Sequence, residues 1–130
     1  MKSILEQTAK QKIKQNLNIV KRGKVMERTA WKAKVKVGCE AEYVKRHNEI
    51  WPEMKEVLKT AGICNYTIFL GGNELFGYFE CEKGLAYSEQ VQSESDVIKK
   101  WNEYMSDILE TEIDPSTGEE IKLIPVFRLD

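Results

Sequence analysis

Apolar and polar residues alternate from Trp31 onward in the stretch TAWKAKVKV, residues 29–37. Trp31, Ala33, Val35 and Val37 fall on one side, and three lysines fall on the other. A period of two is typical of a strand with one buried face. The sequence therefore predicts a strand over residues 29–37.

The pattern then changes to the period of a helix. Apolar and aromatic residues share one helical face at positions 43, 44, 47, 50, 51, 54, 57 and 58. Pro52 should kink or restart this helix after Trp51, because a helix tolerates proline in its first turn but not in its interior. Gly62 is the expected end of the helix.

Two apolar segments, residues 64–70 and 74–82, flank the turn residues Gly71, Gly72 and Asn73. This arrangement predicts a β-hairpin. Both strands carry apolar side chains on both faces. The sheet should therefore be covered on both sides.

The C-terminal third completes the expected fold. A short helix is predicted near residues 85–91, and a longer amphipathic helix should start at a capping box that runs from Ser93 to Asp96. A loop and a last strand, residues 121–129, follow, and Pro125 favours an edge position for that strand. The order β-α-β-β-α-β predicts an α+β fold, a ferredoxin-like sandwich. Because its helices cover only one sheet face, we expect a homodimer packed sheet to sheet.

Charged residues are distributed unevenly along the 130-residue chain. Residues 1–25 hold seven Lys/Arg and one Glu, whereas residues 26–130 hold thirteen Lys/Arg and twenty Asp/Glu. The acidic main part is a poor match for a nucleic-acid binder, and no apolar run is long enough to cross a membrane. We interpret residues 26–130 as one soluble domain.

The basic N-terminal extension, residues 1–25, allows three interpretations. It could be a nucleic-acid or membrane-surface arm, a marginal helix without a specific role, or sequence upstream of a true start at Met26. The third is favoured, because Arg22 and Gly23 allow a purine-rich codon run just before the Met26 codon.

Neither a disulfide framework nor a metal cofactor is predicted. Cys39, Cys64 and Cys81 are odd in number, widely spaced and without a CxxC pair. This usage fits a reducing cytoplasm. A single histidine without clustered carboxylates is a poor set of zinc ligands. A cysteine hydrolase that pairs His47 with Cys39 or Cys64 stays open, although neither cysteine has a local signature.

His47, the only histidine, is the candidate for chemistry. Tyr43 lies four residues before it, on the same helical face. Trp101, Tyr104 and Tyr66 should converge on it between the helices and the sheet. A pocket with aromatic walls, phenols and an imidazole suits a sugar, whereas the alternative is a histidine and aromatics that simply fill the core.

The runs EYVKRHNEIWPEMKEVLKTAGICNYTIFL, KKWNEYMSDI and the terminal VFRL resemble the L-rhamnose mutarotase family. The resemblance extends from about Met26 to the end of the chain, and Y-x3-H-N-x-I-W-P followed by G-x2-N-Y-x-I-[FY]-L carries it. It implies a cytoplasmic homodimer with a dimeric α+β barrel. Such an enzyme interconverts the α and β anomers of L-rhamnose without a cofactor, and neither nucleic acid nor membrane is an expected partner.

The resemblance also implies roles for single residues. The family's catalytic proton donor falls on His47, and its sugar-binding positions fall on Tyr43 and Tyr66. A pair of adjacent tryptophans falls on Trp101 and Asn102, so the chain departs from the family pattern at the second. We expect His47 to act as the acid for ring opening and as the base for closure, while the kink at Trp51 and Pro52 closes one end of the pocket.

Two other functions remain open at this stage. One shares the fold: a dimeric α+β barrel monooxygenase or a haem-handling protein, in which His47 would ligate iron or orient an aromatic substrate. The other is a sugar-binding module without catalytic activity. Anomer exchange separates an enzyme from a binder, and haem absorbance identifies a haem protein.

Overall fold

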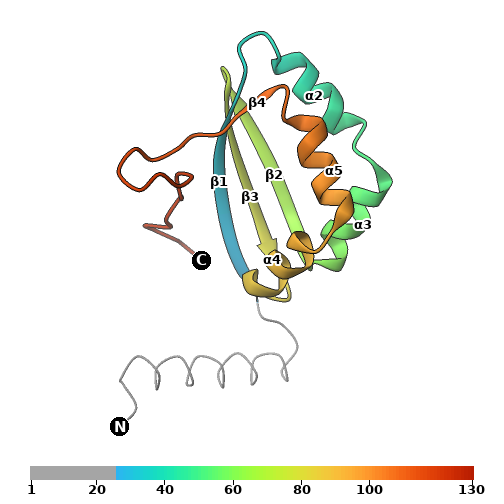
Figure 1. Ribbon diagram of the computed structural model, residues 1–130. Coiled ribbons are helices and arrows are strands. Elements are labelled where there is room, and N and C mark those ends of the chain that lie inside the picture. Colours follow the sequence, from blue (N-terminus) through green and yellow to red (C-terminus); the bar gives the residue numbers. More distant parts are fainter. Residues whose placement is uncertain (1–25) are drawn as a thin grey trace.

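The computed structural model describes residues 26–130 (Figure 1). The interpretations of the basic extension fall on residues 1–25, outside the described residues. The order of elements is β1 (Glu27–Val35), α2 (Glu40–Asn48), α3 (Pro52–Thr60), β2 (Ile63–Gly71), β3 (Glu74–Cys81), α4 (Leu85–Ser93), α5 (Asp96–Met105) and β4 (Leu109–Glu110).

The sheet has the strand order β2-β3-β1-β4, and each neighbouring pair is antiparallel. Helices α2, α3 and α5 lie on one face of this curled sheet, as Figure 1 shows. This arrangement confirms the predicted α+β sandwich. The inward-facing rows of the strands therefore meet the helices, while no helix of residues 26–130 lies on the opposite face, where Glu112 reaches Lys32 at 3.0 Å.

The predicted interruption at Pro52 is confirmed as a complete break between two helices. Trp51 has extended backbone angles, with φ −61° and ψ 136°, and Pro52 is the first residue of α3. The missing N–H of proline costs nothing there, because the first helical N–H groups have no partner inside the helix. Gly62, with φ 80°, follows α3 in the left-handed conformation that glycine tolerates and so ends the helix as expected.

The predicted capping box was wrong by two residues. Ser93 is the last residue of α4, and Ser95 caps α5 instead, with its Oγ accepting a hydrogen bond from the Ile98 N–H at 3.2 Å. The spacing from Ser95 to Ile98 satisfies one of the unpaired N–H groups of the first turn. Both serines of the segment SES could have capped the helix. Because α4 extends to Ser93, Ser95 is the one that caps α5.

The predicted last strand, residues 121–129, was also wrong. The fourth strand is the two-residue β4, which pairs with Lys34 and Val35, and residues 121–130 contain no strand. In Figure 1 the chain after β4 loops out on the side of the sheet away from the helices. Residues 121–130 pair with none of the described strands, and Pro125 lacks one donor. Val126 and Phe127 are 94% and 82% exposed there.

The core lies between the sheet and the helices. Val35 and Leu75 from the sheet are fully buried against Met54, Met105 and other residues of the helical layer. Tyr43 and Trp101 belong to the same cluster. The core and the candidate site therefore share one layer of side chains. Within residues 26–130, no helix has the length and apolar character needed to cross a bilayer.

Candidate functional site

A cavity of about 600 Å³ lies between the helices and the inner face of the sheet. This volume is in the usual range for a small-molecule site. All five residues predicted for the site line it: Tyr43, His47, Tyr66, Trp101 and Asn102. They come from α2, β2 and α5, so elements that are far apart in the sequence converge on one cavity as expected.

His47 is half-buried, and its neutral form is favoured. Its Nδ1 lies 3.1 Å from the Tyr43 carbonyl oxygen. A carbonyl can only accept, so Nδ1 carries the proton and Nε2 keeps a lone pair. Burial lowers the pKa of His47 below its ordinary value, and the carbonyl offsets part of this effect. At neutral pH, the imidazole is therefore able to accept a proton at Nε2.

Aromatic rings fix the position of the imidazole. The Tyr43 ring lies 4.2 Å from the His47 ring between centroids, and the Trp101 ring meets it edge-on at 5.5 Å. Tyr43 and Trp101 are 5% and 7% exposed, so neither ring has room to turn away. The predicted grouping of Tyr43, His47 and Trp101 is present.

Ile50 and Met54, on either side of the kink at Trp51 and Pro52, line the cavity, but the Trp51 ring does not. It packs behind the wall instead, edge-on to Trp101 at 5.1 Å and stacked on Tyr104 at 5.4 Å. The extended backbone at Trp51 points the indole toward α5 rather than toward the cavity. Trp51 and Tyr104 therefore support Trp101 from outside.

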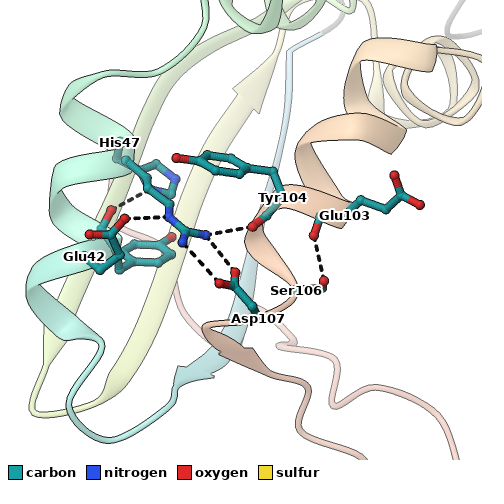
Figure 2. Close-up of polar contacts among 8 residues, drawn as sticks. Glu42, His47, Glu103, Tyr104, Ser106 and Asp107 are labelled. Atoms are coloured by element: carbon teal, nitrogen blue, oxygen red, sulfur yellow. Dashed lines mark hydrogen bonds and ion pairs between the residues drawn. The ribbon is translucent and has the colours of Figure 1, made fainter.

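An arginine next to His47 joins α2 to the end of α5 (Figure 2). Arg46 forms two hydrogen bonds to the Asp107 carboxylate at 2.8 and 3.2 Å, and a third to the Tyr104 carbonyl at 2.7 Å. Its guanidinium also bonds Glu42 and lies 4.3 Å from the centroid of the Tyr104 ring. The pKa of Asp107 is lowered by this pairing. Because the guanidinium is a planar fork, it fixes the spacing of the two helices that carry His47 and Trp101.

The two phenols of the cavity are neutral at physiological pH. Burial raises the pKa of Tyr43, and the neighbouring Tyr66 adds to this rise. Burial also raises the pKa of Tyr66. Each can therefore both donate and accept a hydrogen bond. Tyr66 is 37% exposed and accepts a hydrogen bond from the Trp31 Nε1–H at 2.8 Å.

Three polar groups lie at other positions of the lining. Asn102 is exposed and also lines a neighbouring surface hollow, so its amide stands at the margin of the cavity. Lys55 of α3 and Gln92 of α4 line the cavity as well, and sequence reasoning missed both. Lys55 lies eight residues after His47, a helical spacing that could have indicated it, but the break at Pro52 obscures that signal. Gln92 has no comparable signal, because its place depends on how α4 packs.

Among residues 26–130, no group of three or more His, Cys, Asp or Glu side chains is arranged to hold a metal ion. The chemistry that the described residues offer is proton transfer by an imidazole, hydrogen bonding by two phenols and an amide, and stacking on an indole. Such a set suits a polyhydroxylated ring with apolar C–H faces.

Comparisons with known proteins point to one family. A family model described as L-rhamnose mutarotase matches residues 28–129. An L-rhamnose mutarotase from Lachnoclostridium phytofermentans is 44% identical over 107 residues, which cover 81% of this chain and all of that protein. One from Flavobacterium johnsoniae is 42% identical over 105 residues, covering 79% of this chain and 95% of that protein.

A solved structure supports the same assignment at the level of the fold. The crystal structure of an L-rhamnose mutarotase from Formosa agariphila superposes with a TM-score of 0.63 at 32% identity, covering 80% of this chain and 99% of that one. The predicted family is therefore confirmed, and the chain belongs to the L-rhamnose mutarotase family.

Proposed function

We propose that this protein is an enzyme that interconverts the α and β anomers of L-rhamnose, with His47 as its proton-transfer residue. The observation that carries the proposal is the single imidazole, neutral and held by the Tyr43 carbonyl, in a cavity walled by aromatic rings. The family match supports a sugar isomerase and does not favour the haem, monooxygenase or non-catalytic alternatives.

The neutral imidazole sets the order of the proton transfers. Opening the ring requires removal of the proton from the anomeric hydroxyl and delivery of a proton to the ring oxygen. We propose that the His47 Nε2 takes the anomeric proton as the bond between C1 and the ring oxygen breaks, and that the resulting imidazolium passes this proton to the ring oxygen. After the open aldehyde turns about its C1–C2 bond, Nε2 takes the proton back from that hydroxyl as the ring closes, and the imidazolium gives it to the new anomeric oxygen.

This order is the reverse of the one expected from the sequence, in which His47 was the acid for opening. It follows from the proton on Nδ1 and the lowered pKa of His47, since an imidazole that rests neutral enters the cycle as a base. Tyr43 and Tyr66 would hold sugar hydroxyls, Trp101 would stack on the apolar side of the ring, and the Asn102 amide would bond a hydroxyl at the margin.

We further propose that two copies of the chain associate through the outer sheet face and act in the cytoplasm. Phe69 and Phe76 point away from the helices and are 61% and 39% exposed, and the apolar tail includes Phe127. Apolar side chains gathered on one face are a usual sign of an interface, and a self-complementary contact is the commonest solution for identical chains.

His47→Ala should slow the exchange between the anomers by about 10²- to 10⁴-fold, because it removes the general acid–base group. Two-dimensional exchange NMR on the anomeric protons of L-rhamnose measures the rate above that of buffer. Lys45→Ala, an exposed residue of the same helix, is the control and should keep the parent rate. Equal rates for His47→Ala and the parent would remove His47 from the mechanism. A Soret band on adding haemin, with no effect on sugars, would favour the haem alternative.

The ring of His47 should titrate with a midpoint below about 6.5, the ordinary value for histidine, because burial disfavours its charged form. As the only histidine, it gives a single pair of ring proton signals to follow by NMR. Enzyme-dependent exchange should therefore hold steady above the midpoint and fall as pH drops through it. The free energy of unfolding should also fall as pH drops from about 6.5 to that midpoint, since the unfolded chain binds the proton more tightly. An enzyme-dependent rate that rises with protonation would restore the acid-first order.

Asn102→Ala should raise the KM for L-rhamnose about 2- to 10-fold with little change in kcat, because one hydrogen bond to a sugar hydroxyl contributes about 0.5–1.5 kcal/mol. Exchange NMR at several sugar concentrations separates the two constants. The same measurement on L-fucose and L-lyxose shows which hydroxyl the amide contacts. Removing the amide should raise the KM only for sugars that offer that hydroxyl. Lys100→Ala on α5 is the control, and an unchanged KM for Asn102→Ala would place the amide outside the binding site.

Light scattering should give a mass of about twice 15.1 kDa at micromolar concentration. Phe69→Glu should shift the protein toward the single-chain mass, because it places a charge on the outer sheet face. Val44→Glu changes a comparably apolar residue of α2, 45% exposed, and should leave the mass unchanged. A single-chain mass for the parent, or equal effects of the two variants, would contradict the proposed interface.

A further inference from the structure

A close contact across the sheet links Trp31 to Tyr66. Trp31 lies on β1 opposite Gly77 of β3, and Gly77 lies opposite Ile68 of β2. A Cβ atom on Gly77 would fall inside the Trp31 indole. The indole therefore lies flat over the glycine and crosses the middle strand toward β2. Only a residue without a side chain leaves room for this path.

The indole ends at the Tyr66 hydroxyl. Its Nε1–H donates to the Tyr66 oxygen at 2.8 Å, a short and well-formed bond between neutral groups. An indole N–H can only donate, so the direction of this bond is fixed. With one lone pair of the phenol occupied, the Tyr66 O–H has to donate elsewhere. Tyr66 lines the cavity, so its proton is available to a ligand there.

The backbone of β2 sets up the same orientation. Cys64 pairs with Glu80 and Thr67 with Tyr78, so β2 has two residues between these pairs where β3 has one, which is a β-bulge. Asn65 takes up the extra residue with φ 49°, and its Nδ2 bonds the Glu80 Oε1 at 2.8 Å. Asparagine tolerates this left-handed conformation better than most residues. The bulge lets the buried Ile63 and the cavity residue Tyr66 both face inward, although they lie an odd number of residues apart.

We infer that Trp31 is a positioning residue for sugar binding, which fixes the Tyr66 hydroxyl as a hydrogen-bond donor to a sugar oxygen. This inference rests on the proposed function, in which Tyr66 contacts the sugar. Phe79, whose ring lies 5.0 Å from the Tyr66 ring, also packs against the phenol. The bond from Trp31 also lowers the pKa of Tyr66 against the rise caused by burial, which makes the phenol a better donor.

Trp31→Phe tests this role, because it keeps an aromatic ring over Gly77 and removes the N–H. The KM for L-rhamnose should rise about 3- to 10-fold, in the range expected for loss of one oriented hydrogen bond. Tyr66→Phe should raise it at least as much. In the Tyr66→Phe background, Trp31→Phe should add less than about 2-fold, because the hydroxyl it orients is already absent. Tyr87→Phe, an exposed tyrosine of α4, is the control for removal of a phenol oxygen and should keep the parent KM.

A spectroscopic readout separates orientation from packing. In protein with ¹³C-labelled tyrosines, Trp31→Phe should raise the pKa of Tyr66, and in ¹⁵N-labelled protein, Tyr66→Phe should shift the indole N–H signal of Trp31. The second measurement leaves Trp31 intact and serves if Trp31→Phe does not fold. An unchanged KM in Trp31→Phe, an equal effect in the Tyr66→Phe background, or an unmoved indole signal would each overturn the inference. If the parent exchanged anomers no faster than buffer, the proposed function would fail instead, whatever the indole signal showed.

Discussion

Every wall of the cavity depends on the hydrophobic contact between the helices and a single face of the sheet. Val35 and Leu75 are fully buried in this contact, and Met54 and Met105 press on them from the helical side. At about 25 cal/mol for each Å² of apolar surface removed from water, such burial is the main source of stability in a domain of this size. Tyr43 and Trp101 take part in the same contact and also line the cavity. A change that loosens the core would therefore also displace the rings that hold the imidazole.

His47 takes part both in the packing of the aromatic rings and in the lining of the cavity. It is half-buried, which favours its neutral form, and it keeps one nitrogen bonded to the backbone of its own helix. A fully buried imidazole would have no access to a ligand, and a fully exposed one would titrate like a free histidine. The Arg46 bridge to Asp107 lies on the solvent side of the same helices and restrains their separation. The reactive side chain thus depends on apolar packing on one side and on ionic contacts on the other.

The sequence was a good guide wherever a period or a local breaker decided the structure. The alternation around Trp31, the helical stripe that includes His47 and the break at Pro52 all correspond to real elements. Tyr43, His47, Tyr66 and Trp101 were found because the β-α-β-β-α-β order brings the same faces together, whereas Asn102 came only from the family resemblance, which also gave the others their roles. Those roles remain proposals, although the positions of the residues are now described.

The failures came where tertiary context decides. Residues 121–129 look like a strand, but a strand needs a partner strand, and within residues 26–130 they pair with none. Trp51 carries the aromatic character of a cavity wall, yet its extended backbone turns it against Tyr104. Lys55 and Gln92 entered the cavity through the packing of α3 and α4, which no local pattern reveals. The bond from Trp31 to Tyr66 was equally invisible, because it crosses a strand and depends on the bare backbone of Gly77.

The bulge at Asn65 constrains how the length of this chain can change. In an unbroken strand, side chains three residues apart point to opposite faces. Deleting one residue between Ile63 and Tyr66 would therefore send either a core side chain or the phenol to the outer face. The strand could then no longer place both Ile63 in the core and Tyr66 in the cavity. The surface turn at Gly72, by contrast, lies beyond both and can vary in length without reversing either side chain. In this fold, insertions and deletions should gather at that turn and spare the short interval before Tyr66.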